Sequence, residues 1–259
     1  MSAPGAPVAS VDEEAALVSS APHRPRPRRL LLAGTLLLAV FAAMGVAVAL
    51  RPESSWSQGI DDAWRAAVGV GPDSTLPGTP IAMFFQNFGQ LPGLVTFALL
   101  LPLILVLLGR WRSAIFVFAV QFAGPGLLSQ LAKNLVDRPR PATDAVAGLF
   151  GPLFTVDHGS FPSGHAVSAA IGAVTVLALV PPSRRALRVM VLVLGAVLII
   201  GMIWQRTLIN AHWLSDTVAG TIAGLGTALL LWWAFWPWLQ RDHGRRPWFL
   251  RRRTAPAAV

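Results

Sequence analysis

The sequence contains no cysteine and has few charged residues. The absence of Cys from all 259 residues excludes disulfide frameworks, thiolate zinc sites, cysteine nucleophiles and iron–sulfur clusters. Charged residues make up 13% of the chain, about half of the usual share in a soluble domain, whereas hydrophobic residues make up 54%. This composition, with a mean hydropathy of +0.58, indicates a membrane protein rather than one or two soluble domains.

The apolar residues lie in six blocks that contain no Asp, Glu, Lys or Arg. A block of about 20 residues, at about 1.5 Å per residue, spans the hydrocarbon thickness of a bilayer as a helix. We therefore predict an all-α, polytopic membrane protein, a bundle of six transmembrane helices within residues 30–238. The predicted spans are residues 30–50, 91–109, 113–132, 164–182, 189–204 and 217–238.

Basic residues predict the orientation of these spans. The two tails and the joints of the same side hold 15 of the 21 Lys and Arg residues, so the positive-inside rule places both termini in the cytoplasm. Residues 1–29 are expected to form a disordered basic cytoplasmic tail, and residues 239–259 a basic cytoplasmic tail. The loops 51–90, 133–163 and 205–216 then face outward. Since the Arg residues cluster beside apolar blocks, membrane topology explains the basicity, and no nucleic-acid partner is expected.

Two further patterns have a structural interpretation. Residues 54–68 place Trp56, Ile60 and Trp64 at helical spacing, which fits a short interfacial helix, although a plain loop fits the segment equally. Gly220 is followed four residues later by a second glycine within the last span. This small-xxx-small pattern predicts close packing of that span against a neighbouring helix.

Four of the six basic residues on the predicted outer side lie in only two loops, although the positive-inside rule disfavours basic residues on that side. The first of these loops opens with Lys133, Arg138 and Arg140, and each Arg is followed by Pro. Lys133 alone is explained by a cation at the C-terminal end of a helix. The Arg-Pro-Arg-Pro run is not explained in that way. Because Pro fixes the backbone, we interpret the run as a stiffened clamp for an anion.

The same loop ends in Phe-Pro-Ser-Gly-His and continues directly into the fourth span. Ser163 is a favoured N-cap residue, Gly164 allows a ligand to approach the backbone, and the free N–H groups of a helix start bind anions. His165 adds a titratable group. An ordinary capped membrane helix with an interfacial His explains this segment alone equally well.

The third segment holds Arg206, His212 and Asp216 between the last two spans. If residues 212–216 are helical, His212 and Asp216 lie one turn apart on one face. A carboxylate in that position accepts one ring N–H and raises the nucleophilicity of the other nitrogen. Alternatively, Asp216 only complements the N-terminus of the last span.

The conjunction of the three segments is more specific than any one of them. Three cations, a helix start, two His and one Asp are all predicted at the same outer face of the bundle. Phosphoryl transfer requires charge neutralisation of the phosphate oxygens, an in-line nucleophile and a proton for the leaving oxygen. The sequence offers a candidate for each of these tasks.

In order and spacing, the segments resemble the signature of the type 2 phosphatidic acid phosphatase superfamily, KxxxxxxRP, PSGH and SRxxxxxHxxxD. Residues 133–141 fit the first part in full and residues 162–165 match the second. Arg206, His212 and Asp216 stand at the spacing of the third part. Three spaced motifs together are a highly specific signal, and the six-helix layout agrees with the resemblance.

The resemblance implies a role for each matching residue. His212 is similar to the family's nucleophile, which forms a phosphohistidine, with Asp216 as the residue that orients and activates it. His165 resembles the general acid for the leaving group. The family works without a metal or another cofactor, so none is expected here. The phosphate-binding residues implied by the resemblance are Lys133, Arg140, Ser163, Gly164 and Arg206.

Two residues stand apart from the signature. The family has Ser before the third-motif Arg, whereas this chain has Gln205, which replaces a small hydroxyl contact to phosphate by an amide. Arg138 is not part of the signature and is expected to have a topological or accessory role. The soluble haloperoxidase relatives share the signature, but six predicted spans argue against that branch.

We therefore predict an integral membrane lipid phosphatase whose membrane phosphatase domain comprises residues 30–238. It is expected to hydrolyse a lipid phosphate or diphosphate through a phosphohistidine at the extracytoplasmic face of a bacterial plasma membrane. Polyprenyl diphosphate, phosphatidic acid and phosphatidylglycerophosphate all combine an anionic head with apolar tails. The predicted partners are thus a phospholipid or isoprenoid phosphate substrate and the membrane.

Three alternatives remain at this stage. A phosphotransferase passes the phosphoryl group of the same intermediate to a lipid or sugar acceptor instead of water. A lipid or ion translocator uses the basic loops as a vestibule, but charge-free spans disfavour it because transporters usually need ionisable groups near the midplane. A metal site built from His165, His212 and Asp216 has suitable ligand types, but the resemblance disfavours it.

Overall fold

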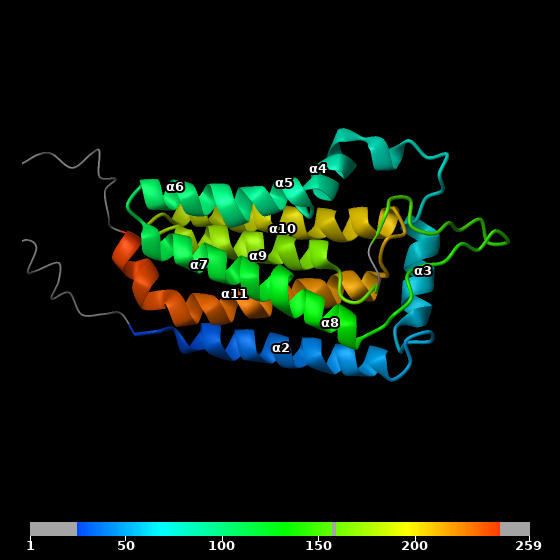
Figure 1. The fold of residues 1–259 in the computed structure, drawn as a ribbon, viewed down its shortest axis with the longest axis horizontal. Helices are drawn as coiled ribbons and strands as arrows, with labels where there is room; N and C mark the ends of the chain where they lie inside the picture. The colour runs from blue at the N-terminus through cyan, green and yellow to red at the C-terminus, as the bar shows by residue number, and fades with distance from the viewer. Residues whose placement is uncertain (1–24, 157–158, 244–259) are drawn as a thin grey trace, which may run out of the picture.

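The computed structural model describes residues 25–156 and 159–243, and within these ranges the chain is helical (Figure 1). No β-strand forms there; one isolated bridge pairs Asp144 with Leu149. The predicted all-α class is confirmed. Most of the two predicted basic tails, residues 1–24 and 244–259, lies outside the described residues.

Thirteen helical segments are present in the described part of the chain. Two of them, η2 and η3, are wide π-helical turns within longer helices. In chain order the segments are α2 (Arg28–Ala49), α3 (Gln58–Val68), η1 (Leu76–Gly78), α4 (Pro80–Phe88), α5 (Leu91–Leu94), η2 (Val95–Leu100), α6 (Leu101–Leu107), α7 (Trp111–Gln121), η3 (Phe122–Leu128), α8 (Ser129–Leu135), α9 (Gly164–Leu179), α10 (Arg185–Leu208) and α11 (Leu214–His243).

The helices support a multi-pass membrane protein. Four are long and apolar enough to cross a bilayer, namely α2, the continuous helix Trp111–Leu135, α10 and α11. A fifth crossing results if α4 and Leu91–Leu107, which meet at an angle of 56°, are one broken span. The helix α9 has only 16 residues. Each of the six predicted blocks is therefore helical, while the count of six crossings stays a prediction.

The last helix extends beyond its predicted end. We expected the last span to stop at Trp238, whereas α11 continues to His243. Its final turns are held inside the bundle because Leu239 is fully buried and the buried carboxylate of Asp242 accepts a hydrogen bond from the backbone N–H of Ser113 at 2.9 Å. Residues 239–243 thus belong to the helix and not to a tail.

A proline explains the wide turn in the third predicted span. Pro125 lies inside η3, where it has no N–H to donate and its ring crowds the preceding turn. Wide turns of this kind occur where the regular hydrogen-bond ladder is interrupted, often at functional sites. The interruption places Pro125 beside the polar cavity described below.

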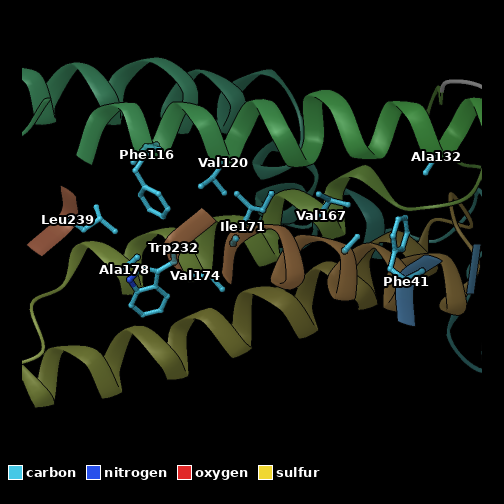
Figure 2. Packing of buried hydrophobic residues seen from close by; sticks show 14 of the residues in the cluster. Phe41, Phe116, Val120, Ala132, Val167, Ile171, Val174, Ala178, Trp232 and Leu239 are labelled. Atoms are coloured by element: carbon cyan, nitrogen blue, oxygen red, sulfur yellow. The ribbon is translucent and has the colours of Figure 1, made fainter. Parts of the chain in front are cut away.

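The hydrophobic core lies around α11, which packs against α9, α2 and α7 (Figure 2). Phe116, Ile171 and Trp232 are among the buried side chains that fill the space between these helices. The predicted small-residue packing is present, because a Cβ atom on Gly220 would lie 2.5 Å from the carbonyl oxygen of Ser163. Close contact of α11 with α9 brings the second and third motifs together.

The helix α3 lies across one end of the bundle (Figure 1). The segment 54–68 therefore contains a short helix rather than a plain loop, while its place at the membrane interface stays a prediction. Trp64 in this helix donates from its indole N–H to the hydroxyl of Thr207 in α10 at 2.9 Å. The described chain begins and ends at the opposite end of the bundle (Figure 1).

Candidate active site

Six of the eight predicted site residues line one polar cavity at the end of the bundle that carries α3. The cavity has a volume of about 270 Å³. Its lining combines residues of η3, α8, α9 and α10 with residues of the α4–α5, α8–α9 and α10–α11 connections. Ser163 and Asp216 are the two predicted residues that do not line it. The six that do are Lys133, Arg140, Gly164, His165, Arg206 and His212.

The helix ends and their connections position these side chains. Lys133 lies in the last turn of α8, His165 in the first turn of α9 and Arg206 in the last turn of α10. The second and third motifs are also joined directly, since the backbone N–H of Ser163 donates to the carbonyl of Asp216 at 3.0 Å. Residues distant in sequence therefore meet because α8 and α10 end, and α9 begins, at the same end of the bundle.

Three cations give the cavity its electrostatic character. The Lys133 ammonium donates to the Gly159 carbonyl at 3.0 Å, Arg140 donates to the Ala211 carbonyl, and Arg206 donates to the Oε1 atom of Gln86 at 2.6 Å. These acceptors are neutral, and none of the described residues that line the cavity is acidic. A concave site that is lined by fixed positive charges favours the binding of an anion such as phosphate.

The two ring nitrogens of His212 have different environments. The Nδ1 atom lies 2.8 Å from the carbonyl oxygen of Ser160, and the Nε2 atom lies 3.3 Å from the guanidinium of Arg140. A carbonyl oxygen only accepts hydrogen bonds, so Nδ1 carries the proton and Nε2 keeps its lone pair. Burial, with help from Arg206 and Arg140, lowers the pKa of His212 to about 4. Both effects favour a neutral imidazole with an available Nε2.

Asp216 lies behind His212 and does not reach the cavity. One carboxylate oxygen is 3.9 Å from Nδ1 of His212, which is longer than a hydrogen bond. The same oxygen accepts from the hydroxyl of Ser160 and from the backbone N–H of Trp213 at 3.0 Å. In this arrangement a backbone carbonyl orients the His212 ring directly, and Asp216 supplies a nearby negative charge.

Ser163 has the predicted capping geometry. Its hydroxyl accepts from the backbone N–H of Ala166, with a distance of 3.5 Å, and its side chain is fully buried. The next residue, Gly164, lines the cavity with its backbone. A contact between the Ser163 hydroxyl and phosphate stays a prediction.

Gln86 in α4 contacts two of the motif residues, although no motif indicated it. Its carbonyl oxygen lies 3.2 Å from Nε2 of His165, and its side-chain Oε1 accepts from Arg206. The same end of α4 lies close to the His165 ring, because a Cβ atom on Gly89 would lie 2.0 Å from Cδ2 of His165. No regular spacing connects α4 with the motifs, so only the structure reveals these contacts.

Gln205 replaces the usual Ser but does not take over a place at the cavity. Its side chain is fully buried, and its amide donates to Oε1 of Gln86 at 2.9 Å. Gln86 therefore accepts from both Gln205 and Arg206. The Gln205 side chain thus helps to hold Gln86 in place, and the loss of a small hydroxyl contact to phosphate stays a prediction.

Arg138 has a more specific environment than the sequence indicated. Its side chain is fully buried, and its guanidinium forms ion pairs with Asp61 of α3 at 2.8 Å and with Asp216 of α11 at 2.7 Å. A residue placed only by membrane topology would not need two buried partners. Asp61 is the second residue that sequence reasoning missed at this end of the bundle.

An apolar cavity adjoins the polar one. It has a volume of about 550 Å³ and lies between α5, η2 and the α7–η3 helix. Phe97 and Phe122 contribute to its apolar lining. The residues that line both cavities are Gly89, Gln90, Pro125 and Ser168.

The geometry also bears on the metal alternative. Among residues 25–156 and 159–243, no three His, Asp or Glu side chains gather in a group that would hold a metal ion. His165, His212 and Asp216 therefore do not form a metal site in this arrangement. Independence from metals stays a prediction about the activity.

Comparisons with known proteins agree with the motifs. A family model described as the PAP2 superfamily matches residues 111–240. None of the curated proteins matches the chain. Among solved structures, a transmembrane PAP2 type phosphatidylglycerolphosphate phosphatase from Bacillus subtilis is similar in fold, with a TM-score of 0.59 and 23% sequence identity. The similarity covers 76% of this chain and 93% of that chain.

Proposed function

The chain belongs to the PAP2 superfamily, and on this premise we propose that it is a membrane phosphatase that hydrolyses a lipid phosphate or diphosphate. The observation that carries the proposal is the junction of the two cavities. Three cations and two His line the polar cavity, and an apolar cavity among the membrane helices opens beside it. This pair of cavities matches an anionic head group joined to apolar tails.

The first half-reaction follows from the state of His212. Its Nε2 atom attacks phosphorus in line, so an N–P bond forms while the bond from phosphorus to the leaving oxygen breaks. Lys133, Arg140 and Arg206 neutralise the charge on the phosphate oxygens. His165 then supplies a proton to the departing lipid oxygen or lipid phosphate.

The second half-reaction releases phosphate. Water attacks the phosphohistidine, the N–P bond breaks, and Nε2 of His212 recovers its lone pair. His165, which gave up a proton in the first step, now accepts one from the attacking water. Because each His returns to its starting state, the cycle requires no further reactant.

Purified, detergent-solubilised protein tests the proposal directly. We expect release of inorganic phosphate, in the presence of EDTA, from at least one of polyprenyl diphosphate, phosphatidic acid and phosphatidylglycerophosphate. His212→Ala removes the nucleophile, so its release should fall by about three orders of magnitude or more. Wild-type activity in the His212→Ala variant, or folded protein without release from any lipid, would contradict the proposal.

The lipid character of the substrate has its own test. Ala98 lines the apolar cavity, whereas its neighbour Leu99 is 59% exposed on the outer face of the same helix. Ala98→Trp fills the cavity and should raise KM about tenfold for a long-tailed lipid phosphate but leave a soluble monophosphate unaffected. Leu99→Trp is the matched control. Equal behaviour of the two variants would show that the tails bind elsewhere.

A further inference from the structure

A buried cluster of charges lies directly behind the third motif. Arg138 donates from Nη1 to Asp216 at 2.7 Å and from Nη2 to Asp61 at 2.8 Å, and all three side chains are inaccessible to solvent. Asp61 comes from α3, outside residues 111–240 that match the family. One guanidinium is therefore shared by two carboxylates, and only one of them belongs to the signature.

The hydrogen bonds around Asp61 fix it in this place. Its Oδ1 atom accepts from the backbone N–H of Ser215 at 2.8 Å. Its Oδ2 atom accepts from the hydroxyls of Ser57 and Ser215 at 2.8 and 2.7 Å, in addition to Arg138. These donors hold the carboxylate in one orientation. Ser215 also links it directly to the residue before Asp216.

The charges of this cluster do not cancel. Asp61 and Asp216 contribute two negative charges and Arg138 one positive charge, so the cluster carries a net charge of −1 in a region closed to water. Without Asp61, Arg138 would neutralise Asp216 completely. The position of Asp61 therefore determines whether a net negative charge remains behind the His212 ring.

We propose that Asp61 is a positioning residue that shares Arg138 with Asp216 and so preserves a negative charge behind His212 during phosphoryl transfer. The inference rests on the proposed function. When Nε2 bonds to phosphorus, Nδ1 keeps its proton, so the ring acquires a positive charge. A net charge of −1 behind the ring stabilises this cation in a water-excluded site, where charges interact strongly.

A purely structural role for Asp61 makes a different prediction. In that case the cluster only fastens α3 to the Arg138 loop and to the start of α11, as a buried ion pair that costs much when broken. Loss of Asp61 would then reduce the amount of folded protein but leave the rate of each folded molecule unchanged. The two roles are separated by kinetics measured on folded protein.

The decisive variants are Asp61→Asn and Asp62→Asn. Asp61→Asn removes one buried charge with almost no change of shape. Asp62 is the matched control, because the same substitution in the same helix affects an exposed carboxylate that accepts from Gln58 at 2.9 Å. We expect Asp61→Asn to lower kcat and the rate of phosphoenzyme formation, measured by rapid quench, about tenfold or more. KM should change less than about twofold, and Asp62→Asn should match the wild type.

A rescue experiment tests the charge balance independently of the single variant. Asp61→Asn leaves Arg138 to neutralise Asp216, whereas Asp61→Asn combined with Arg138→Gln returns the cluster to a net charge of −1. The double variant should be more active per folded molecule than Asp61→Asn alone, with Tm recorded for each. If Asp61→Asn alone does not fold, the double variant is compared with the wild type, which has the same net charge: a kcat within about tenfold of the wild type is expected, and a larger loss would overturn the role of Asp61.

The outcomes separate this inference from the proposed function. If the wild type releases phosphate and His212→Ala does not, the proposed function stands. Equal kcat in Asp61→Asn and Asp62→Asn, or a double variant no better than Asp61→Asn alone, would then overturn the role of Asp61. Failure of the wild type to release phosphate would instead reject the proposed function.

Discussion

At the scale of single residues, His212 shows how a backbone atom determines the chemistry of a side chain. The Ser160 carbonyl holds the proton on Nδ1, and the lone pair on Nε2 is directed away from that carbonyl. Arg140 lies on the Nε2 side. Because the adjacent cations and the burial both disfavour the imidazolium, the free protein keeps this ring, the proposed nucleophile, neutral without a proton transfer.

This environment predicts unusual tolerance of acid. An imidazole with a pKa of 6.5 is about 97% protonated at pH 5, whereas one with a pKa of about 4 is protonated to about 9%. A protonated ring does not attack phosphorus, so activity is lost only as the pH falls towards 4. We expect kcat/KM, measured from pH 4 to 8, to show its acidic limb near pH 4 rather than near 6.5.

The substrate also ionises in this pH range, because the second pKa of a phosphate group lies near 6. A variant distinguishes the acidic limb that His212 causes from the one that the substrate causes. Arg140 is one of the charges that lower the pKa of His212. Arg140→Gln should therefore move the enzyme's acidic limb to higher pH and leave the substrate's ionisation in place. An acidic limb that does not move would mean that His212 does not control it.

Sequence spacing predicted those residues that belong to the three motifs and missed those that support them. The residues Lys133, Arg140 and Arg206 are recognisable because cations rarely occur at outer loops of a membrane protein. Gln86 and Asp61 reach the site from α4 and α3 through folding alone. A Gln in an apolar segment and an Asp in an amphipathic segment have many ordinary explanations, so nothing in their spacing distinguishes them.

At the scale of elements, the end of α4 sets the position of the proposed general acid. Gly89 follows α4 directly and packs against the His165 ring. A Cβ atom at this position would lie only 2.3 Å from Cγ of His165, so only glycine fits without a shift of the ring. Gln86 holds the same ring through its carbonyl. The helix α4 is therefore as important for His165 as α9, in which His165 lies.

Gly89→Ala should consequently affect catalysis more than folding. The added methyl group must displace the His165 ring, so kcat should fall about tenfold or more while Tm changes by only a few degrees. Gly78→Ala is a suitable control, because nothing lies within 4 Å of a Cβ at that position in the segment that leads to α4. Wild-type kcat in Gly89→Ala would show that the ring of His165 does not need its present position.

The boundaries of the helices were predicted less well than their existence. Charge-free blocks identified where the apolar helices lie, because a helix that crosses the bilayer needs about 20 mostly apolar residues. The ends depend on specific contacts, such as the buried carboxylate of Asp242 that accepts from Ser113 and extends α11. The bend between α4 and α5 lies at Gly89 and Gln90, just before Pro92, and hydropathy does not record it.

At the scale of the whole molecule, the candidate site lies at the end of the bundle that carries α3, and residues 25 and 243, where the described chain begins and ends, lie at the opposite end (Figure 1). The arrangement is consistent with an even number of crossings, and the distribution of basic residues predicts that the ends are cytoplasmic. A site that faces outward, as the basic residues predict, would meet lipid phosphates of the outer leaflet. The orientation therefore determines which pool of substrate the protein meets.

Single cysteines test this orientation, and the chain suits the test because it contains no Cys of its own. Val146, in the loop that carries Arg140, is fully exposed, and Ser183 is exposed at the opposite end between α9 and α10. In intact cells a membrane-impermeant maleimide should label Val146→Cys, whereas Ser183→Cys should react only after permeabilisation. The wild type serves as the blank. The reverse pattern would place the cavity on the cytoplasmic side and the substrate in the inner leaflet.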